Sequence, residues 1–554
     1  MIPAVLFKTL YRKPELIAFV LIALYLFIGL SNIRVPGLYD DEAFPACGSL
    51  QIIKQTGPFM PSLKIFNIHF PLMLASHETA AESYILLPLL SLFGINVVTI
   101  RLVPIFMGAA GLILLYYFIK VFFDTKTALL SLSLLVINPV FLLENKLGFN
   151  SASMLHCVMM AVLLCFFAWY RKRRFVYFIL GAFLLGIGLS IRVWFAWFIV
   201  VLFTFTGLYY YKISGLLKSK ATLYILTGVI AFSLGSVFFI LYNLTAKLAT
   251  LRFVIDGFNL SGTNADSGSY LNHLLKQLHV FSGFISGQWS IEEQGSWFHR
   301  SWSYPEPFVK FPVNNMLMWV FYASFLWLSV SLLFKKSFFS KKRVLFICGL
   351  ILIIILLSPL VSSRLAGSRL FILYPFLMIT IALALVDVIK RNKYLGFFAV
   401  SVFCITMFFN VKTFLNWQYY FEYTGGIGNN SDAIYALVDW LKAQQIKEPL
   451  VCDWGMEHNL ISLGSGKIEP RVVYGLVKAF PYGKGEEDMF FIANCRKYFI
   501  NSSFRYIYHT PAFTNLNRFD VFTKIAHEMG KEVSEEKIFH QRDGKPIFIV
   551  YSVK

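Results

Sequence analysis

The stretch that decides the fold is the apolar run ELIAFVLIALYLFIGLSNI (residues 15–33) together with GLYDDEAFPACGSLQII (37–53), which follows it closely. The first run is long and apolar enough to cross a bilayer as one helix. Three consecutive acids, Asp40, Asp41 and Glu42, come where that helix would leave the membrane. The chain contains only 30 Asp and Glu in 554 residues, so three together at a membrane exit need a physical reason.

The composition is that of a protein with many membrane-spanning helices. The chain is 57% hydrophobic and 14% charged, with a mean hydropathy of +0.64, whereas a soluble protein would carry nearly twice that charged fraction. A net charge of +20 could indicate nucleic-acid binding. The basic residues, however, form short clusters between apolar runs, which is the positive-inside pattern of membrane proteins, so we expect no nucleic-acid partner.

The apolar runs predict a polytopic α-helical membrane protein with about eleven spans and the N-terminus inside. This topology puts every strong basic cluster on the cytoplasmic side, including RKRR at Arg171–Arg174 and KKSFFSKKR from Lys335. The stretch SYILLPLLSLFG (83–94) is short for a span, and counting it would move every later cluster outside. We therefore expect it to be an interfacial or re-entrant helix. The predicted spans lie near residues 15–33, 101–123, 127–143, 152–170, 175–190, 193–211, 221–243, 316–334, 343–361, 369–389 and 394–412.

Three large pieces are then expected outside: the loops 34–100 and 243–315, and a polar tail. We predict a transmembrane domain over residues 1–412 and an extracytoplasmic α/β domain over 413–554. In the tail, SDAIYALVDWLKAQQ (431–445) has helical spacing, PLVCDWG (449–455) is typical of a buried strand, and KIFHQRDGKPIFIVYSV (537–553) predicts a hairpin turning at Asp543–Gly544. Cys452 and Cys495 could pair if the tail lies outside, or both could be free thiols.

The polar residues that interrupt the apolar pattern map to the outer face. Arg192 is the most informative, because it lies in a very short connection between two apolar runs, where a charge is costly unless it has a partner or a ligand. Two further arginines lie on the same side, where the positive-inside rule disfavours them. The whole set is Asp40, Asp41, Glu42, His77, Glu78, Glu82, Asn150, Arg192, Arg364 and Arg369.

Acids and arginines on one membrane face suit one kind of chemistry. A carboxylate can act as general base on a hydroxyl, and arginines can bind a phosphate and stabilise it as it leaves. Each residue alone also has a simpler explanation. Acids at span ends are often solvated loop residues, Arg364 and Arg369 could be snorkelling anchors, Asn150 could bond backbone, and the sequence HET at His77 is no metal motif.

The residues also resemble a known family. DDEAFPACGSLQIIKQTGP (40–58) after a first span, followed by HETAAESYILLPLLSLFGINVVTIRLVPIFMGAAGLILLYYF (77–118), is similar to the C-type (GT-C) membrane glycosyltransferases. The relatives most like it are the protein O-mannosyltransferases and the lipid A aminoarabinose transferase. The family's Asp-Glu pair falls on Asp41 and Glu42, and Arg192 stands where many members carry Lys. Two departures are SHETAAE in place of a common His-Pro-Pro, and Asn150 in place of an Asp.

The resemblance implies an inverting transferase that moves a sugar from a polyprenyl-phosphate donor to a glycan, lipid or protein hydroxyl at the outer membrane face. Asp41 would be the base, with Asp40 and Glu42 orienting it or the acceptor. Arg192, with Arg364 or Arg369, would hold the lipid phosphate. His77 and Glu78 are candidates for binding the donor sugar or a divalent metal ion, and Asn150 joins the substrate-binding set.

Two other classes of function stay open at this stage. A transporter or flippase of lipid-linked sugars would need ionisable residues in mid-membrane and often shows two similar halves, which this sequence lacks. A non-catalytic assembly subunit would have the tail as its binding part, and the acid-rich loop disfavours it. The Lys- and Phe-rich composition favours a bacterial inner membrane.

Overall fold

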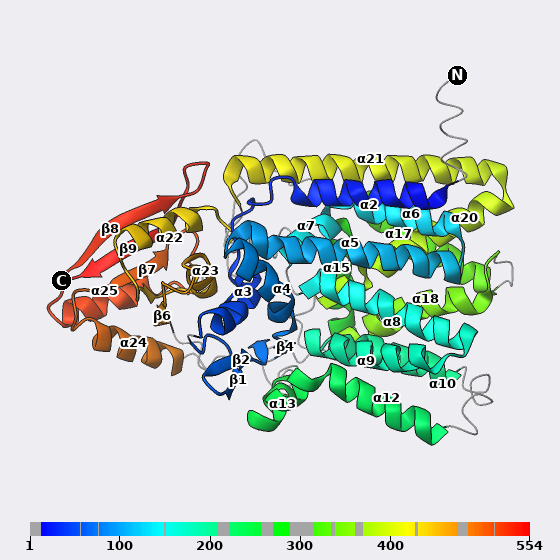
Figure 1. Cartoon of the computed structure of the whole chain (residues 1–554). Helices are drawn as coiled ribbons and strands as arrows, with labels where there is room; N and C mark the ends of the chain where they lie inside the picture. Colours follow the sequence, from blue (N-terminus) through cyan, green and yellow to red (C-terminus); the bar gives the residue numbers. More distant parts are fainter. Residues whose placement is uncertain are drawn as a thin grey trace.

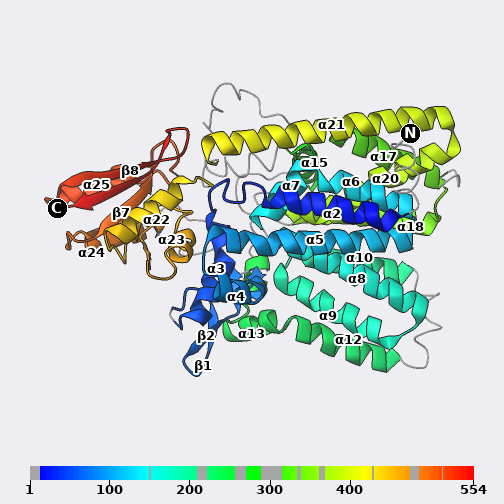
Figure 2. The same ribbon diagram turned by 45° about the horizontal axis from the view of Figure 1, so that its top comes forward.

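The computed structural model describes residues 13–55, 57–75, 77–148, 151–208, 221–255, 270–287, 315–333, 338–360, 369–426, 430–474, 486–514 and 516–554. These residues form a bundle of roughly parallel helices with a smaller α/β domain at one end (Figure 1). A view turned by 45° shows the same two parts, with the short helices and strands of residues 40–93 between the bundle and the α/β domain (Figure 2).

Apolar helices make up the bundle, and each predicted span coincides with one helix or with a bent pair. By length and composition, five helices in the described part of the chain can cross a membrane, or seven if each bent pair is one span. α2, α9 and α10 are apolar but shorter. The bundle helices are α2 (Pro14–Leu30), α5 (Val97–Phe122), α6 (Thr125–Val136), α7 (Pro139–Leu147), α8 (Ala152–Lys172), α9 (Phe175–Ile191), α10 (Phe195–Leu208), α12 (Ala221–Gly235), α13 (Val237–Thr245), α15 (Tyr270–Ser286), α17 (Asn315–Leu333), α18 (Lys341–Leu357), α20 (Tyr374–Arg391) and α21 (Lys393–Thr424).

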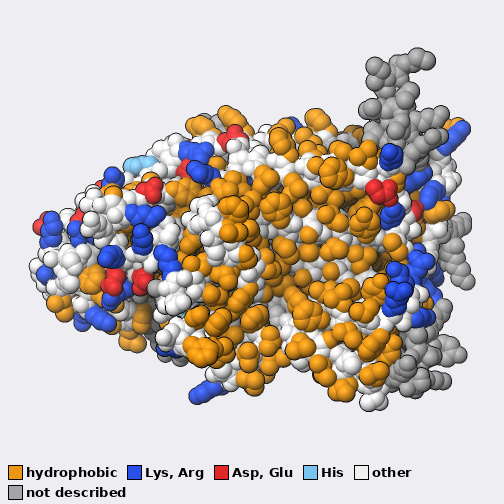
Figure 3. Space-filling view, viewed as in Figure 1, with side chains coloured by type: hydrophobic (Ala, Val, Ile, Leu, Met, Phe, Trp, Pro, Cys, Tyr) orange, Lys and Arg blue, Asp and Glu red, His pale blue; other side chains and the backbone are white. Residues whose placement is uncertain are grey.

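α20 is the central helix of the bundle. From Tyr374 to Asp387 every residue is buried, and α6, α17, α18 and α21 pack around it. A helix that is apolar on all sides is typical of a protein core or of a membrane span, and α20 is covered by other helices. The surface of the bundle is a broad hydrophobic band, with the α/β domain at its left and lysines and arginines gathered at its right end (Figure 3).

Two helices differ from the pattern expected from the sequence. α15 lies in the segment predicted as an outer loop, where it packs on α17. α21 contains the predicted span 394–412 but continues to Thr424, so one helix leads from the bundle to the α/β domain. The predicted short helix at 83–94 is present as α4 (Ala81–Phe93).

The α/β domain has a five-stranded mixed sheet in the order β6-β5-β7-β9-β8. α22 and α23 cover one face of this sheet and α24 and α25 the other, because alternate strand residues point to opposite faces. The hairpin of β8 and β9 turns at Asp543–Gly544 as predicted. Cys452 and Cys495 share one core cluster as free thiols. The elements are β5 (Leu450–Val451), β6 (Arg471–Val472), β7 (Arg505–His509), β8 (Val533–His540), β9 (Pro546–Val553), α22 (Ala433–Ala443), α23 (Glu457–Leu463), α24 (Glu486–Tyr498) and α25 (Phe519–Glu528).

The connection between α2 and α5 forms α3 (Asp40–Ile53), two short hairpins and α4. The hairpins pair β1 (Ser62–Ile65) with β2 (Ile68–Pro71), and β3 (Met73–Ala75) with β4 (Glu78–Thr79). Gly37 lies directly against the backbone at Ser431, where a Cβ atom would stand 2.1 Å from the Ser431 carbonyl. The chain can therefore pass this close to the α/β domain only with glycine at position 37.

Arg101 holds this connection on the bundle. Its guanidinium donates to both carboxylate oxygens of Glu42, with Nε 2.9 Å from Oε2 and Nη2 3.1 Å from Oε1. It also donates to the carbonyl oxygens of Ile33, Pro36 and Gly37. The guanidinium has five N–H groups, and these five bonds match them. Both side chains are fully buried, so charge pairing and backbone anchoring occur in one place.

Arg101→Met should destabilise the protein by about 3–5 kcal/mol, because the Glu42 carboxylate would stay buried without its cation. Thermal unfolding of the purified protein in detergent would measure the loss. The matched control is Glu42→Leu combined with Arg101→Met. This double variant has no unpaired buried carboxylate, so its free energy of unfolding should return most of the way to that of the wild type. A double variant as unstable as Arg101→Met would contradict this role of the ion pair.

Candidate active site

The three acids that open α3 have three different environments. Glu42 belongs to the ion pair with Arg101 described above. Asp40 instead binds the α/β domain, because one of its oxygens accepts from the backbone N–H of His458 at 2.7 Å and the other lies 3.0 Å from Nδ1 of the same histidine. Asp40 thereby caps the N-terminus of α23.

His458 is charged at neutral pH in this contact. Burial lowers the pKa of His458, but the charge of Asp40 and its hydrogen bond outweigh burial and raise that pKa to about 9. The ring also packs edge-on against Phe44, with 4.2 Å between the ring centroids. Asp40 is therefore a charge-paired residue that joins the first turn of α3 to the α/β domain.

Asp41 is the member of the triplet that remains available. No hydrogen bond or ion pair joins its side chain to another residue in the part of the chain that the structure describes. Burial, and next the neighbouring charge of Asp40, raises the pKa of Asp41 to about 7. It lines a small cavity with Glu78, Glu82 and Arg192. A carboxylate with this pKa can take up and release a proton near neutral pH.

Glu78 and Glu82 share one hydroxyl group. The Oγ of Ser151 lies 2.6 Å from Oε1 of Glu78 and 2.9 Å from Oε2 of Glu82. A serine hydroxyl has a single hydrogen, so it can donate to only one of these carboxylates. Burial and the charge of Glu78 raise the pKa of Glu82 to about 7. A protonated Glu82 that donates to Ser151, while Ser151 donates to Glu78, satisfies all three groups.

Ser151 has a backbone conformation that fits a functional position. Its φ of 52° and ψ of 30° lie in the left-handed region, directly before α8 begins at Ala152. Non-glycine residues seldom adopt this conformation, and the strain persists only where surrounding contacts fix it. The two carboxylate contacts of Ser151 are such contacts.

Arg192 is held between these acids and a second cavity. Its Nη2 lies 2.7 Å from Oε2 of Glu78, and both side chains are almost fully buried. The very short connection predicted between two spans is present, since α9 ends at Ile191 and α10 begins at Phe195. The Nε of Arg192 is buried without a hydrogen-bond partner among the described residues. The Nη2 of Arg192 is thus paired with Glu78, and its Nε has an N–H group with which a ligand could form a hydrogen bond.

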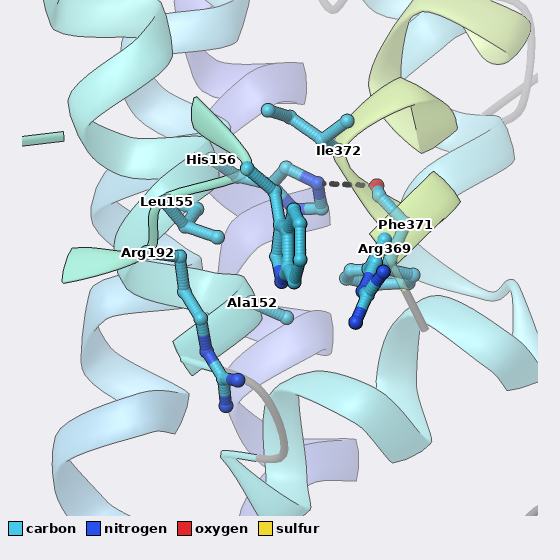
Figure 4. A pocket seen from close by; sticks show the side chains of 8 residues that line it. Ala152, Leu155, His156, Arg192, Arg369, Phe371 and Ile372 are labelled. Atoms are coloured by element: carbon cyan, nitrogen blue, oxygen red, sulfur yellow. Dashed lines mark hydrogen bonds between the residues drawn. The ribbon is translucent and has the colours of Figure 1, made fainter. Parts of the chain in front are cut away.

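The second cavity is lined by Arg192, Trp194, His156 and Arg369. Arg192 and Arg369 reach toward it from opposite sides, as Figure 4 shows. The Arg369 guanidinium stacks on Trp194 at 3.4 Å from the ring centroid. His156 donates from Nε2 to the carbonyl oxygen of Phe371 at 2.8 Å, which fixes the turn that follows Arg369. Two guanidinium groups around one cavity make a site suited to an anion.

His77 lies beside this pair of cavities and is neutral. It stacks on Phe253 with 5.1 Å between centroids, and its carbonyl oxygen accepts from the N–H of Val193. Burial, followed by the charges of Arg192 and Arg369, lowers the pKa of His77 well below its usual value. The carboxylate of Glu78 is already in contact with Arg192 and Ser151.

The structure thus brings together Asp41, Glu78, Arg192, Arg369 and, beside them, His77. Asp40 and Glu42 lie next to them but bind other partners. Asn150 and Arg364 lie outside the described residues. In the described part of the chain, no group of three or more His, Cys, Asp or Glu is arranged to hold a metal ion.

Sequence reasoning did not identify Arg101, Ser151, Trp194, His156 or His458 as members or supports of the site. Arg101 carried a usable signal, because a charge near the start of a long apolar helix needs a partner. Its partner is 59 positions away, and His458 is 418 positions from Asp40. No local pattern connects residues so far apart.

Comparison with known proteins gives a family match over part of the chain and a shared fold. Residues 79–240 match the family model of dolichyl-phosphate-mannose-protein mannosyltransferases. No curated protein sequence matches the chain.

Solved structures are similar along nearly the whole chain. The crystal structure of ArnT from Cupriavidus metallidurans bound to undecaprenyl phosphate matches with a TM-score of 0.62 and 13% identity, covering 96% of this chain and 97% of that one. Its apo state matches with a TM-score of 0.60, at the same identity and coverage. The apo oligosaccharyltransferase of Archaeoglobus fulgidus matches with a TM-score of 0.53 and 12% identity, over 89% of this chain and 69% of that chain. These matches confirm the resemblance in the sequence: residues 79–240 are similar to the mannosyltransferase family, and the fold of the chain is similar to that of ArnT and of the archaeal oligosaccharyltransferase.

Proposed function

We propose that this enzyme moves a sugar from a polyprenyl phosphate to a hydroxyl acceptor by one inverting displacement, with Asp41 as general base. The observation that carries the proposal is the division of the acid triplet. Asp40 is bound to His458 and Glu42 to Arg101, so Asp41 alone is available beside Arg192 and the second cavity. Undecaprenyl phosphate is bound in the similar ArnT structure, and the fold is shared.

In this reaction the acceptor hydroxyl gives its proton to the Asp41 carboxylate, and its oxygen attacks the anomeric carbon of the sugar. The bond from that carbon to the phosphate oxygen breaks on the opposite face, which inverts the anomeric centre. The phosphate leaves with one more negative charge than it brought. Arg192 and Arg369 are the groups that would bind it, since guanidinium–phosphate hydrogen bonds strengthen as that charge grows.

Glu78 is a positioning residue in this proposal. It holds one edge of Arg192 through a 2.7 Å ion pair, while the Nε of Arg192 is buried without a hydrogen-bond partner among the described residues. The cavities around Asp41 and between the arginines measure about 10 and 20 Å³. Each has room for about one water molecule, so the donor must displace side chains when it binds.

The proposed topology has about eleven spans, a transmembrane domain over 1–412 and the active site and domain 413–554 outside the cytoplasm. The lysines and arginines at the end of the bundle far from the α/β domain support this orientation (Figure 3). A bacterial inner membrane fits the composition. The acceptor is proposed only as a hydroxyl of a glycan, lipid or protein.

Asp41→Asn should lower turnover roughly 10²–10⁴-fold, because an amide keeps the shape of the side chain but cannot accept the proton. Transfer from a purified polyprenyl-phosphate sugar would measure this, with the acceptor identified from the glycan that is lost on deletion. Asp40→Asn is the matched control and should cost much less. Full activity in Asp41→Asn would exclude this residue as the base.

The same assay has a pH signature. Asp41 acts when ionised, and its pKa is about 7, so wild-type kcat/KM should rise about tenfold per pH unit below 7 and level off above it. An acid with a raised pKa loses its proton only as the pH rises through that value, so kcat/KM should increase with pH and not decrease. A rate that is flat from pH 5 to 8 would contradict Asp41 as the titrating base.

Arg192→Leu should raise the donor KM about 10–100-fold, the range for a lost charged hydrogen bond. Arg192→Lys should retain part of the binding, because an ammonium still meets a phosphate as a point charge. Arg174→Leu is the control, since it removes an exposed arginine from the far end of the bundle. An unchanged donor KM in a folded Arg192→Leu protein would assign Arg192 to structure alone.

A reporter fused after Lys554 should behave as extracytoplasmic in intact cells, because the basic clusters place the other end of the bundle inside. Alkaline phosphatase fused there should be active, and a cytoplasmic reporter such as green fluorescent protein should not fluoresce after Sec export. The opposite pair of results would overturn both the topology and the outer site.

A further inference from the structure

A cavity of about 380 Å³ lies at the end of the bundle opposite to the candidate active site. The ends of α5 and α8, the second half of α10 and the start of α18 surround it. It falls in the size range of sites for small organic ligands. Nothing in the proposed reaction uses this cavity.

The cavity is separate from the donor site. Arg101 and Ser151 lie at the beginnings of α5 and α8, whereas Phe122 and Tyr170 lie near the ends of the same helices. A helix rises about 1.5 Å per residue, which puts Phe118 and Phe122 roughly 25–32 Å from Arg101 along α5. That distance is close to the hydrocarbon thickness of a bilayer, so the two sites lie in opposite leaflets.

The walls are apolar and the mouth is cationic. Seven of the thirteen lining residues are Phe or Tyr, from Phe118 on α5 to Phe346 on α18. The polar lining residues include Lys342 and Arg343, and none of the described lining residues is acidic. A ligand with an apolar body and a negative head is complementary to this arrangement.

The cations are fixed to the walls by aromatic contacts. Arg343 donates to the carbonyl oxygen of Phe122 and lies 5.4 Å from the centre of its ring. Arg171 lies 5.8 Å from the ring of Phe167, and Arg173 lies 5.0 Å from the ring of Tyr170. Phe167 and Tyr170 line the cavity. Lys342 and Arg343 thus line the cavity, and Arg171 and Arg173 each lie against the ring of a lining residue.

We propose that this cavity binds an anionic phospholipid of the leaflet opposite to the active site, with its phosphate at Lys342 and Arg343 and part of an acyl chain between the aromatic rings. Basic pockets between membrane helices on the cytoplasmic side bind such headgroups. The sugar donor is a poor occupant, because its phosphate has to reach Arg192 in the other leaflet. The orientation follows from the basic clusters and does not depend on the transferase mechanism.

Native mass spectrometry of the full-length protein in detergent would test this, with phosphatidylglycerol and phosphatidylcholine of the same acyl chains as probes. Phosphatidylglycerol should bind more tightly. Lys342→Gln with Arg343→Gln should weaken its binding roughly 30-fold, since each cation near a lipid headgroup contributes about a factor of five, or about 1 kcal/mol. Leu202→Trp should also weaken binding, by filling the apolar part without a change of charge.

Lys126→Gln with Lys393→Gln is the matched control, because it removes two cations from the same end of the bundle but outside the cavity. It should bind phosphatidylglycerol as the wild type does. Melting temperatures would verify that each variant is folded. If the variant with Lys342→Gln and Arg343→Gln does not fold, Leu202→Trp alone tests the proposal. Equal binding of the two lipids, undiminished phosphatidylglycerol binding in both cavity variants, or displacement by equimolar undecaprenyl phosphate would overturn the proposal.

Discussion

The buried ion pair of Arg101 and Glu42 is the constraint on which the site depends. A charge near the start of a long apolar helix is tolerated only with a partner, and Glu42 supplies that partner with two hydrogen bonds. The remaining three donors of Arg101 bind the backbone between residues 33 and 37. The same contact therefore holds the connection between α2 and α3, together with the first turn of α3 that carries the acid triplet.

In the proposed mechanism, this arrangement gives each of the three adjacent acids a separate task. A single acid at the start of α3 would be free to rotate toward water or toward the arginines. Here Glu42 anchors the turn to the bundle and Asp40 anchors it to the α/β domain, so Asp41 is fixed from both sides. Pre-organisation of this kind costs stability elsewhere and is typical of catalytic constellations.

Much of this could be predicted from the sequence. Hydropathy and the basic clusters locate the helices, and the very short connection between two apolar runs is enough to single out Arg192 as a charge that needs a partner. The pairing of acids with their partners could not be predicted, because Asp40 and His458 are 418 positions apart in the sequence. The role of Ser151 could not be predicted either, because no sequence pattern distinguishes it from the other serines. α15 was missed because its apolar residues cover only one face, whereas a predicted span requires continuous apolarity.

The electrostatics of the site link the two halves of the proposed reaction. Glu78 compensates one charge of Arg192, and ionised Asp41 adds a second negative charge to the same small cavity. When Asp41 accepts the acceptor's proton, that negative charge disappears from beside Arg192. The phosphate gains a negative charge in the same step, as its bond to the sugar breaks. The attraction between Arg192 and the leaving phosphate is therefore strongest in the transition state. An interaction that is stronger in the transition state than with bound substrate lowers the activation barrier. Burial is what makes this coupling effective, because in bulk water the same change of charge would be screened.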